Sequence, residues 1–180
     1  MKKIIEYIQE NHDRYIGELT EFLRIPSVST DPEHNEAVKA AAEFVARQLQ
    51  EAGMTTVEIF PTKGHPIVYA ERLVEEAKPT LLVYGHYDVQ PVDPIELWES
   101  APFEPTIRNG ELYARGAADD KGQVFIHFKS AEAFLNTSGQ LPVNIKYLIE
   151  GEEEIGSPHL DPFIETHQDL LKADVAMVSD

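Results

Sequence analysis

The chain has 180 residues, of which 42% are hydrophobic and 26% charged, a balance typical of a folded globular domain rather than a disordered segment. Its formal net charge of −17, from 15 basic and 32 acidic residues, argues against binding to nucleic acid or to an anionic membrane, because phosphate binding depends on lysine and arginine. Cysteine is absent, which excludes disulfides, thiol nucleophiles and cysteine-ligated zinc, so any metal must be held by histidine and carboxylate.

Helical periodicity opens the chain. Apolar residues from Ile4 to Leu23 recur at spacings of three, four and seven, and the pattern breaks before Pro26, because the residue before a proline disfavours helix. Acidic and amide side chains interrupt this segment, so it lacks the continuous apolar stretch of a signal peptide, and we expect a cytoplasmic protein. A second amphipathic helix is predicted over about 36–51, with Gly53 as its stop signal.

Strand-like runs follow at 56–60, 67–73 and 80–84. The last run, TLLVYGH, is almost wholly apolar and predicts a central strand that is covered on both faces. A proline-rich loop is expected over 91–105, and Asn109-Gly110 predicts a hairpin between two short strands.

The remaining pattern predicts a helix over about 121–136, a buried strand over 141–149, a short helix after Ser157-Pro158 and a final strand over 175–178. This order indicates an α/β fold, a three-layer sandwich with a mostly parallel or mixed central sheet covered by helices. No repeat, low-complexity tract or linker interrupts the sequence, so we expect one domain over 1–180.

Four short strings place histidine and carboxylates where a predicted strand ends or a helix begins, which is where α/β proteins put their chemistry. They are His86-Tyr-Asp88, Asp119-Asp120-Lys121-Gly122, Glu152-Glu153-Glu154 and Ser179-Asp180. Each alone has an ordinary interpretation: a structural histidine, a helix N-cap, a solvated charge run and a terminal acid. Their combination at four strand-end positions favours a metal site.

The chemistry of these residue types supports two divalent ions. A neutral imidazole suits zinc, manganese or cobalt, and Asp88 could accept the second ring N–H of His86 and fix its tautomer. Two carboxylates about 4 Å apart repel by roughly 4 kcal/mol at an effective dielectric near 20, so the triplet would protonate, spread apart or bind a cation. We expect a co-catalytic metal pair, with one glutamate of the triplet as ligand and its neighbour as general base.

Longer segments around these strings resemble a known family. YGHYDVQP, LWESAPFEPTIRNGELYARGAADDKG, LPVNIKYLIEGEEEIGS and VSD are similar to the zinc-dependent exopeptidases and amidohydrolases that include carnosinase, cytosolic non-specific dipeptidase, aminoacylase, carboxypeptidase G and succinyl-diaminopimelate desuccinylase. The resemblance is strongest to the carnosinase-like dipeptidase branch and runs over nearly the whole chain.

The resemblance implies a role for each site residue. His86 and Asp180 would bind the first metal, with Asp88 orienting His86. Asp119 would bridge the two metals and form a cis peptide bond with Asp120. Glu154 would bind the second metal and Glu153 would be the general base, so Asp88 and Glu153 are the catalytic candidates and zinc the favoured metal, with manganese or cobalt also suited.

The resemblance also implies missing parts. Family members continue past the residue matching Asp180 and supply a further histidine for the second metal, a lid domain and usually a dimer contact. We therefore expect the N-terminal portion of a catalytic domain, with the lid absent and little activity of its own, from an intact enzyme that is a homodimer. We expect His65, His127 and His159 to be ordinary structural residues, with His127 packing inside its helix.

Three functional hypotheses remain open. The leading one is hydrolysis of the amide bond of dipeptides or short peptides. An alternative keeps the mechanism and changes the substrate to an N-acyl amino acid. The third treats the 180 residues as a non-catalytic metal-binding or oligomerising module.

Overall fold

The computed structural model describes residues 1–180 and contains both helices and strands. The helices are α1 (Lys2–Glu10), α2 (His12–Leu23), α3 (Asn35–Glu51), α4 (Lys121–Ser138), α5 (Leu160–Thr166) and α6 (Gln168–Leu171), with short 3-10 turns η1 (Pro32–His34), η2 (Ile95–Leu97) and η3 (Glu153–Ile155). The strands are β1 (Thr56–Phe60), β2 (Ile67–Arg72), β3 (Thr80–His86), β4 (Thr106–Arg108), β5 (Glu111–Tyr113), β6 (Asn144–Glu150) and β7 (Val175–Val178).

Five of the strands form one mixed sheet in the order β1-β2-β6-β3-β7. β1 and β2 are antiparallel, and so are β2 and β6, whereas β3 runs parallel to both β6 and β7. The carboxyl ends of β6, β3 and β7 therefore meet at one edge of the sheet. The remaining strands, β4 and β5, form the predicted hairpin, in which Asn109 and Gly110 take positive φ angles of 53° and 84°.

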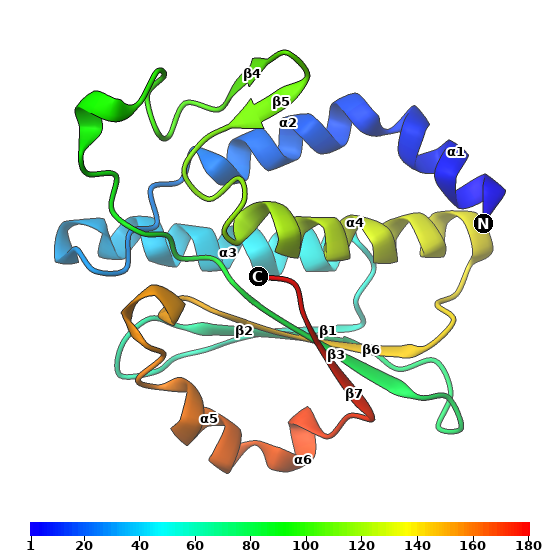
Figure 1. Cartoon of the computed structure of the whole chain (residues 1–180). Coiled ribbons are helices and arrows are strands. Elements are labelled where there is room, and N and C mark those ends of the chain that lie inside the picture. Colours follow the sequence, from blue (N-terminus) through cyan, green and yellow to red (C-terminus); the bar gives the residue numbers. More distant parts are fainter.

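Helices cover both faces of the sheet, which confirms the predicted three-layer α/β sandwich. Figure 1 shows α1 to α4 on one side of the sheet and α5 with α6 on the other. The larger core cluster lies under α2, α3 and α4, where the rings of Phe22 and Phe44 stack with centroids 4.7 Å apart. A smaller cluster packs α5 and α6 against the opposite face; it contains Ile67, Tyr69, Leu148, Phe163 and Leu171.

One expectation about these elements is wrong. The periodic segment 4–23 forms two helices instead of one, because Asn11 leaves helical geometry and its side-chain amide donates back to the Tyr7 carbonyl at 2.8 Å. The predicted central strand β3 is an interior strand between β6 and β7, but β6 is the middle strand and all its residues are buried, whereas residues 80–82 of β3 are only half-buried. Both β3 and β6 are rich in apolar residues, so the hydrophobic pattern alone did not show which of them is the middle strand of the sheet.

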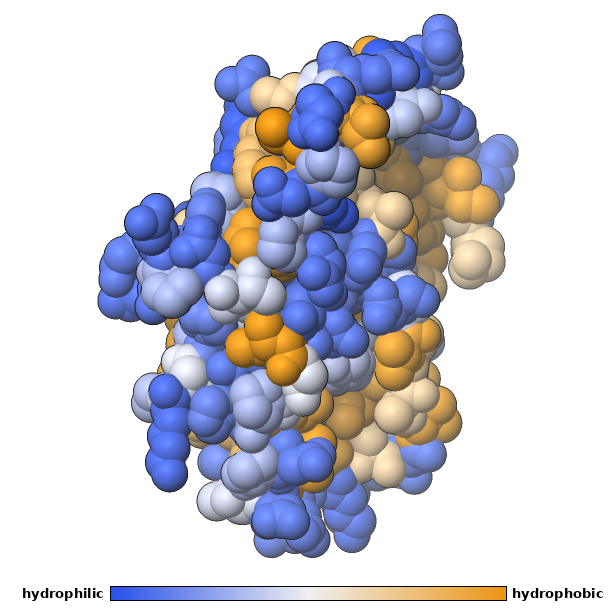
Figure 2. All heavy atoms as spheres, turned by 60° about the vertical axis from the view of Figure 1, so that its left-hand side comes forward, coloured by the Kyte–Doolittle hydropathy of each residue, from blue (hydrophilic) through white to orange (hydrophobic).

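The surface is largely polar. Most of the face shown in Figure 2 is hydrophilic, with separate hydrophobic patches between the charged side chains. None of the helices combines the length and the hydropathy that crossing a bilayer requires.

A buried charged network joins α2, α3 and α4, which lie on the same side of the sheet. The Lys129 ammonium donates to the side-chain amide oxygen of Gln48 at 2.6 Å and to the Glu132 carboxylate at 3.0 Å, and it lies 2.5 Å from a Glu18 oxygen. Glu132 also pairs with Arg14, which ties α4 to α2. Lys129 and Glu132 are each 6% exposed in their side chains, so neither charge has water as a substitute partner.

We expect Lys129→Met to destabilise the fold by about 1–3 kcal/mol, because the buried Glu132 carboxylate keeps Arg14 but loses Lys129, and Gln48 and Glu18 lose the same partner. Urea unfolding followed by circular dichroism measures this difference. Lys39→Met, on the exposed face of α3, is the matched control and should change the free energy of unfolding by less than about 0.5 kcal/mol. Equal effects of the two variants would contradict the importance of the network.

Candidate metal centre

The strand register brings the predicted site residues together. His86 ends β3 and pairs with Glu150 of the parallel strand β6, so the triplet that follows Glu150 emerges beside it. Tyr84 pairs with Val178 of the parallel strand β7. His86 and Asp180 each follow these paired residues by two positions, so they emerge at the same edge of the sheet. Figure 1 shows the C-terminal residue next to the beginning of α4, the helix that Asp119 and Asp120 precede.

The His86 imidazole is buried and oriented. Its Nδ1 lies 3.1 Å from the Asp88 carbonyl oxygen and 3.3 Å from the Asp88 carboxylate, and since both are acceptors, Nδ1 carries the proton. In the neutral form that metal binding requires, the lone pair is on Nε2, which lies 3.1 Å from an Asp119 oxygen and 3.9 Å from oxygens of Glu153 and Asp180. Nε2 has no hydrogen-bond partner, although the side chain is 0% exposed.

Asp119 and Asp120 diverge from the start of α4. The peptide bond between them is cis, as the family resemblance implied. Asp120 is buried and accepts the His86 backbone N–H at 3.1 Å, whereas the Asp119 side chain is 54% exposed and faces the imidazole. Gly85 allows this close approach, since a Cβ atom there would lie 2.6 Å from an Asp120 oxygen. The Asp pair therefore divides into one inward and one outward carboxylate.

Asp88 holds the glutamate triplet as well as the imidazole. Its fully buried carboxylate accepts the backbone N–H of Glu153 at 3.3 Å and that of Glu154 at 3.1 Å. The Gln90 amide donates to the Glu154 carboxylate at 2.5 Å. The Glu153 carboxylate accepts no hydrogen bond and its side chain is 35% exposed. The two neighbouring glutamates thus differ in how firmly they are held.

The donor set fits divalent metal. Donor atoms of His86, Asp119 and Asp180 lie within 4.8 Å of one another, and so do those of His86, Glu153 and Glu154. One imidazole nitrogen with several carboxylate oxygens suits zinc, manganese or cobalt. The partnerless Nε2 at the centre of both groups is the observation that favours a cation, because a buried polar atom without a partner is costly.

The electrostatics of the site also favour positive charge. Burial opposes the charged form of His86, but the hydrogen bond and charge of Asp88, together with the charges of Asp120 and Glu153, raise the pKa of this imidazole to about 9. Burial raises the pKa of the Asp120 carboxyl to about 6. Burial also raises the pKa of Glu154 above its usual range, with the Asp119 charge adding to the shift. Each shift reports negative charge crowded into a poorly solvated space.

Three supporting contacts were missed by reasoning from the sequence. The fully buried Lys121 donates from Nζ to the carbonyls of Phe22 and Ile25 at 3.1 and 2.7 Å, which anchors the start of α4 to the end of α2. His127, expected only to pack, forms a hydrogen bond from Nε2 to the Ser179 hydroxyl at 2.7 Å. The third contact is that of Gln90 with Glu154. The lysine directly after Asp119-Asp120 was the one available signal in the sequence.

Comparison with known proteins places the chain in a family. Residues 82–180 match the family model described as peptidase family M20/M25/M40. The chain belongs to this peptidase family. The match covers the strings that contain His86, Asp119, the triplet and Asp180, and the expected family membership is confirmed.

Relatives within the family are dipeptidases and a carboxypeptidase. The chain is 33% identical to human Beta-Ala-His dipeptidase in an alignment 194 positions long, which covers 100% of this chain and 38% of that protein. It superposes with a TM-score of 0.92 on the di-peptidase Dug1p of Saccharomyces cerevisiae, at 28% identity over 99% of this chain and 40% of that one. The metallo-carboxypeptidase Sso-CP2 of Sulfolobus solfataricus gives a TM-score of 0.84 at 44% identity, covering 91% of this chain and 36% of that one.

The chain therefore spans 36–40% of the length of these relatives. Their names assign no role to any single residue of this chain.

We expect Asp88→Asn to weaken zinc binding by roughly 10- to 100-fold, because an amide cannot accept from the imidazole and from two backbone N–H groups at once. Competition with a chromophoric chelator measures the affinity. Asp169→Asn, at an exposed position in α6, is the control and should bind zinc as the unchanged chain does. Unchanged affinity of Asp88→Asn would contradict the positioning role of Asp88.

Proposed function

We propose that this chain forms the N-terminal portion of the catalytic domain of a metal-dependent dipeptidase, which hydrolyses the amide bond of dipeptides or short peptides. The observation that carries this proposal is the buried Nε2 of His86, which has no hydrogen-bond partner and faces carboxylates from three other segments. The family and the dipeptidase relatives supply the reaction class.

His86 and Asp180 would hold one divalent ion, Glu154 the other, and Asp119 both. Asp119 suits the bridging position because its carboxylate lies 3.1 Å from the imidazole and is the more exposed of the Asp pair. When bound, two such ions polarise the scissile carbonyl and lower the pKa of the attacking water. Zinc is the metal we propose, with manganese and cobalt as the alternatives that the same ligands accept.

Glu153 would act as the general base. Its carboxylate accepts no hydrogen bond from the protein and stays partly exposed beside His86, so it is free to accept a proton from the attacking water. It would then return that proton to the nitrogen of the leaving amine as the amide C–N bond breaks. Glu154, held by Gln90, is better placed as a ligand than as a proton carrier.

In the intact enzyme, we expect Glu153→Gln to retain zinc and to lower turnover of a dipeptide by about 10²- to 10⁴-fold, because the amide cannot accept the proton of the water. Zinc content and initial rates on the same preparation separate the two effects. Loss of zinc from Glu153→Gln would make Glu153 a ligand and reverse the roles of the two glutamates.

Two other hypotheses are testable. A hydrolysis panel of dipeptides against N-acyl amino acids, run on the full-length protein, separates a dipeptidase from a deacylase, and the dipeptidase relatives favour the former. We expect the 180-residue chain to bind zinc but to turn over little by itself, since only one histidine, His86, lies in its two candidate ligand groups. Substantial turnover by this chain would contradict that expectation.

A further inference from the structure

Glu152, the first residue of the triplet, has no part in the mechanism above, and its buried carboxylate is nonetheless fully engaged. The side chain is 5% exposed and belongs to neither candidate ligand group. Its Oε1 accepts the backbone N–H of His65 at 3.1 Å and its Oε2 accepts from Nδ1 of His159 at 2.8 Å. The carboxylate thus joins the glutamate turn to two other segments.

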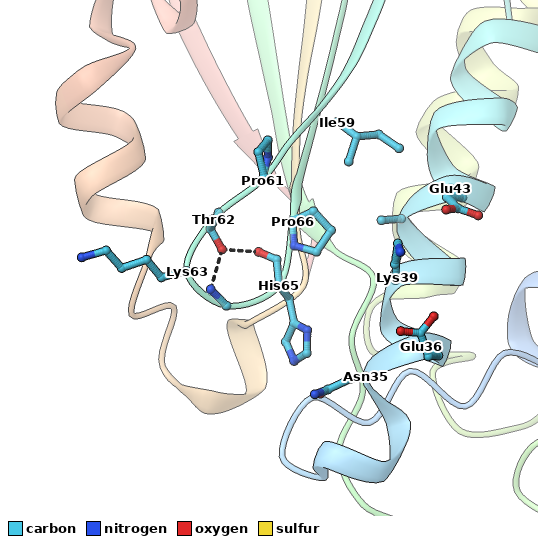
Figure 3. Close-up of a pocket in the computed structure, with 12 residues that line it drawn as sticks. Asn35, Glu36, Lys39, Glu43, Ile59, Pro61, Thr62, Lys63, His65 and Pro66 are labelled. Atoms are coloured by element: carbon cyan, nitrogen blue, oxygen red, sulfur yellow. Dashed lines mark hydrogen bonds between the residues drawn. The ribbon is translucent and has the colours of Figure 1, made fainter.

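One of these segments is the loop Pro61–Pro66, which connects β1 to β2. Figure 3 shows this loop facing Asn35, Glu36, Lys39 and Glu43 of α3 across a groove of about 710 Å³. The Thr62 hydroxyl braces the loop from within: it donates to the His65 carbonyl at 2.7 Å and accepts the Gly64 N–H at 2.9 Å. The loop therefore presents the His65 N–H to Glu152 in a fixed orientation.

Gly64 shows how closely the loop and the carboxylate approach. A Cβ atom at this position would lie 1.9 Å from Oε1 of Glu152 and 2.9 Å from Nδ1 of His159. No side chain other than hydrogen fits there unless Glu152 moves. The contact is therefore sensitive to a single methyl group placed outside the metal site.

The backbone of Glu152 also organises the turn that carries the next two glutamates. Its carbonyl oxygen accepts the N–H of Ile155 at 3.1 Å and that of Ser157 at 2.8 Å. Asp88 holds the N–H groups of Glu153 and Glu154 from the side of the metal site. The turn is thus held from two sides, by Asp88 and by Glu152.

We propose that Glu152 is a positioning residue for the metal centre: by binding the loop Pro61–Pro66 and His159, its carboxylate sets where the carboxylates of Glu153 and Glu154 stand relative to His86. The proposal rests on the metal site of the proposed function. It adds a residue that touches neither metal nor substrate, together with a loop distant in sequence and a histidine seven residues further along the chain.

Zinc affinity of the purified chain, measured by competition with a chromophoric chelator, tests the proposal. Glu152→Gln leaves one oxygen for two donors, and Gly64→Ala displaces the carboxylate from the loop side. We expect each variant to bind zinc roughly 10- to 100-fold more weakly than the unchanged chain. Gly17→Ala is the matched glycine control, because a Cβ atom there meets nothing within 4 Å, and it should bind zinc normally.

A pair of substitutions at His159 separates positioning from general stability. His159→Asn keeps an N–H donor near the position of Nδ1, and His159→Phe removes it, so the first should retain zinc affinity better than the second. Urea unfolding of the metal-free variants shows whether each is folded, and Gly64→Ala with the His159 pair decides the matter should Glu152→Gln not fold.

Normal zinc affinity in Glu152→Gln and in Gly64→Ala would overturn the positioning role while leaving the metal site intact. Failure of the unchanged chain to bind zinc would instead overturn the metal site of the proposed function, and the role of Glu152 with it.

Discussion

The buried carboxylate of Asp88 is the constraint on which the rest of the site depends. One side chain, with no exposure to water, faces the Nδ1 proton of His86 and accepts the N–H groups of Glu153 and Glu154. These groups come from the ends of two parallel strands, β3 and β6, which the sheet brings side by side. Water cannot replace these partners, because the Asp88 carboxylate is buried. The imidazole and the glutamate turn are therefore fixed relative to each other.

This arrangement concentrates negative charge where the fold gives it little solvent. Asp88 and Asp120 are buried, and Asp119, Glu153 and Asp180 approach the same imidazole nitrogen. Burial is the main cause of the raised pKa values of Asp120 and Glu154, whereas the pKa of His86 is raised, against the effect of burial, by the neighbouring carboxylates. In a chain with a net charge of −17, such a cluster costs free energy unless a cation neutralises it. Hydrogen bonds thus hold the site in place, while its negative charge is not neutralised by an ion pair with lysine or arginine. This combination lowers the stability of the fold but suits the binding of a metal ion.

Much of this could be predicted from the sequence, for identifiable reasons. The strand ends were visible because apolar runs stop at His86 and Glu150, and the chemistry was visible because the residue types there are unusual beside buried strands. The break at Asn11 was not, because the apolar periodicity continues through it while the side chain bonds back to Tyr7. The partners of Lys121 and His127 were not predictable either, since both contacts join elements far apart in sequence. Periodicity identifies elements, whereas such contacts depend on how the elements pack.

Those long-range contacts explain how each ligand segment is held by a different part of the fold. Lys121 fixes the Asp119-Asp120 segment to the end of α2, and His127 of α4 contacts Ser179 next to Asp180. Gln90 and Asp88 hold the glutamate turn from the loop after β3. Each of the three segments that bring carboxylates to His86 therefore has its own anchor: α2 for Asp119-Asp120, α4 for Asp180 and the loop after β3 for the glutamate turn. The ligands of such a site are already in position before the metal binds. The loss of conformational entropy that orders them occurs during folding and does not weaken metal binding. This arrangement reduces the stability of the fold, because it buries Lys121. Desolvation lowers the pKa of the Lys121 ammonium to about 7.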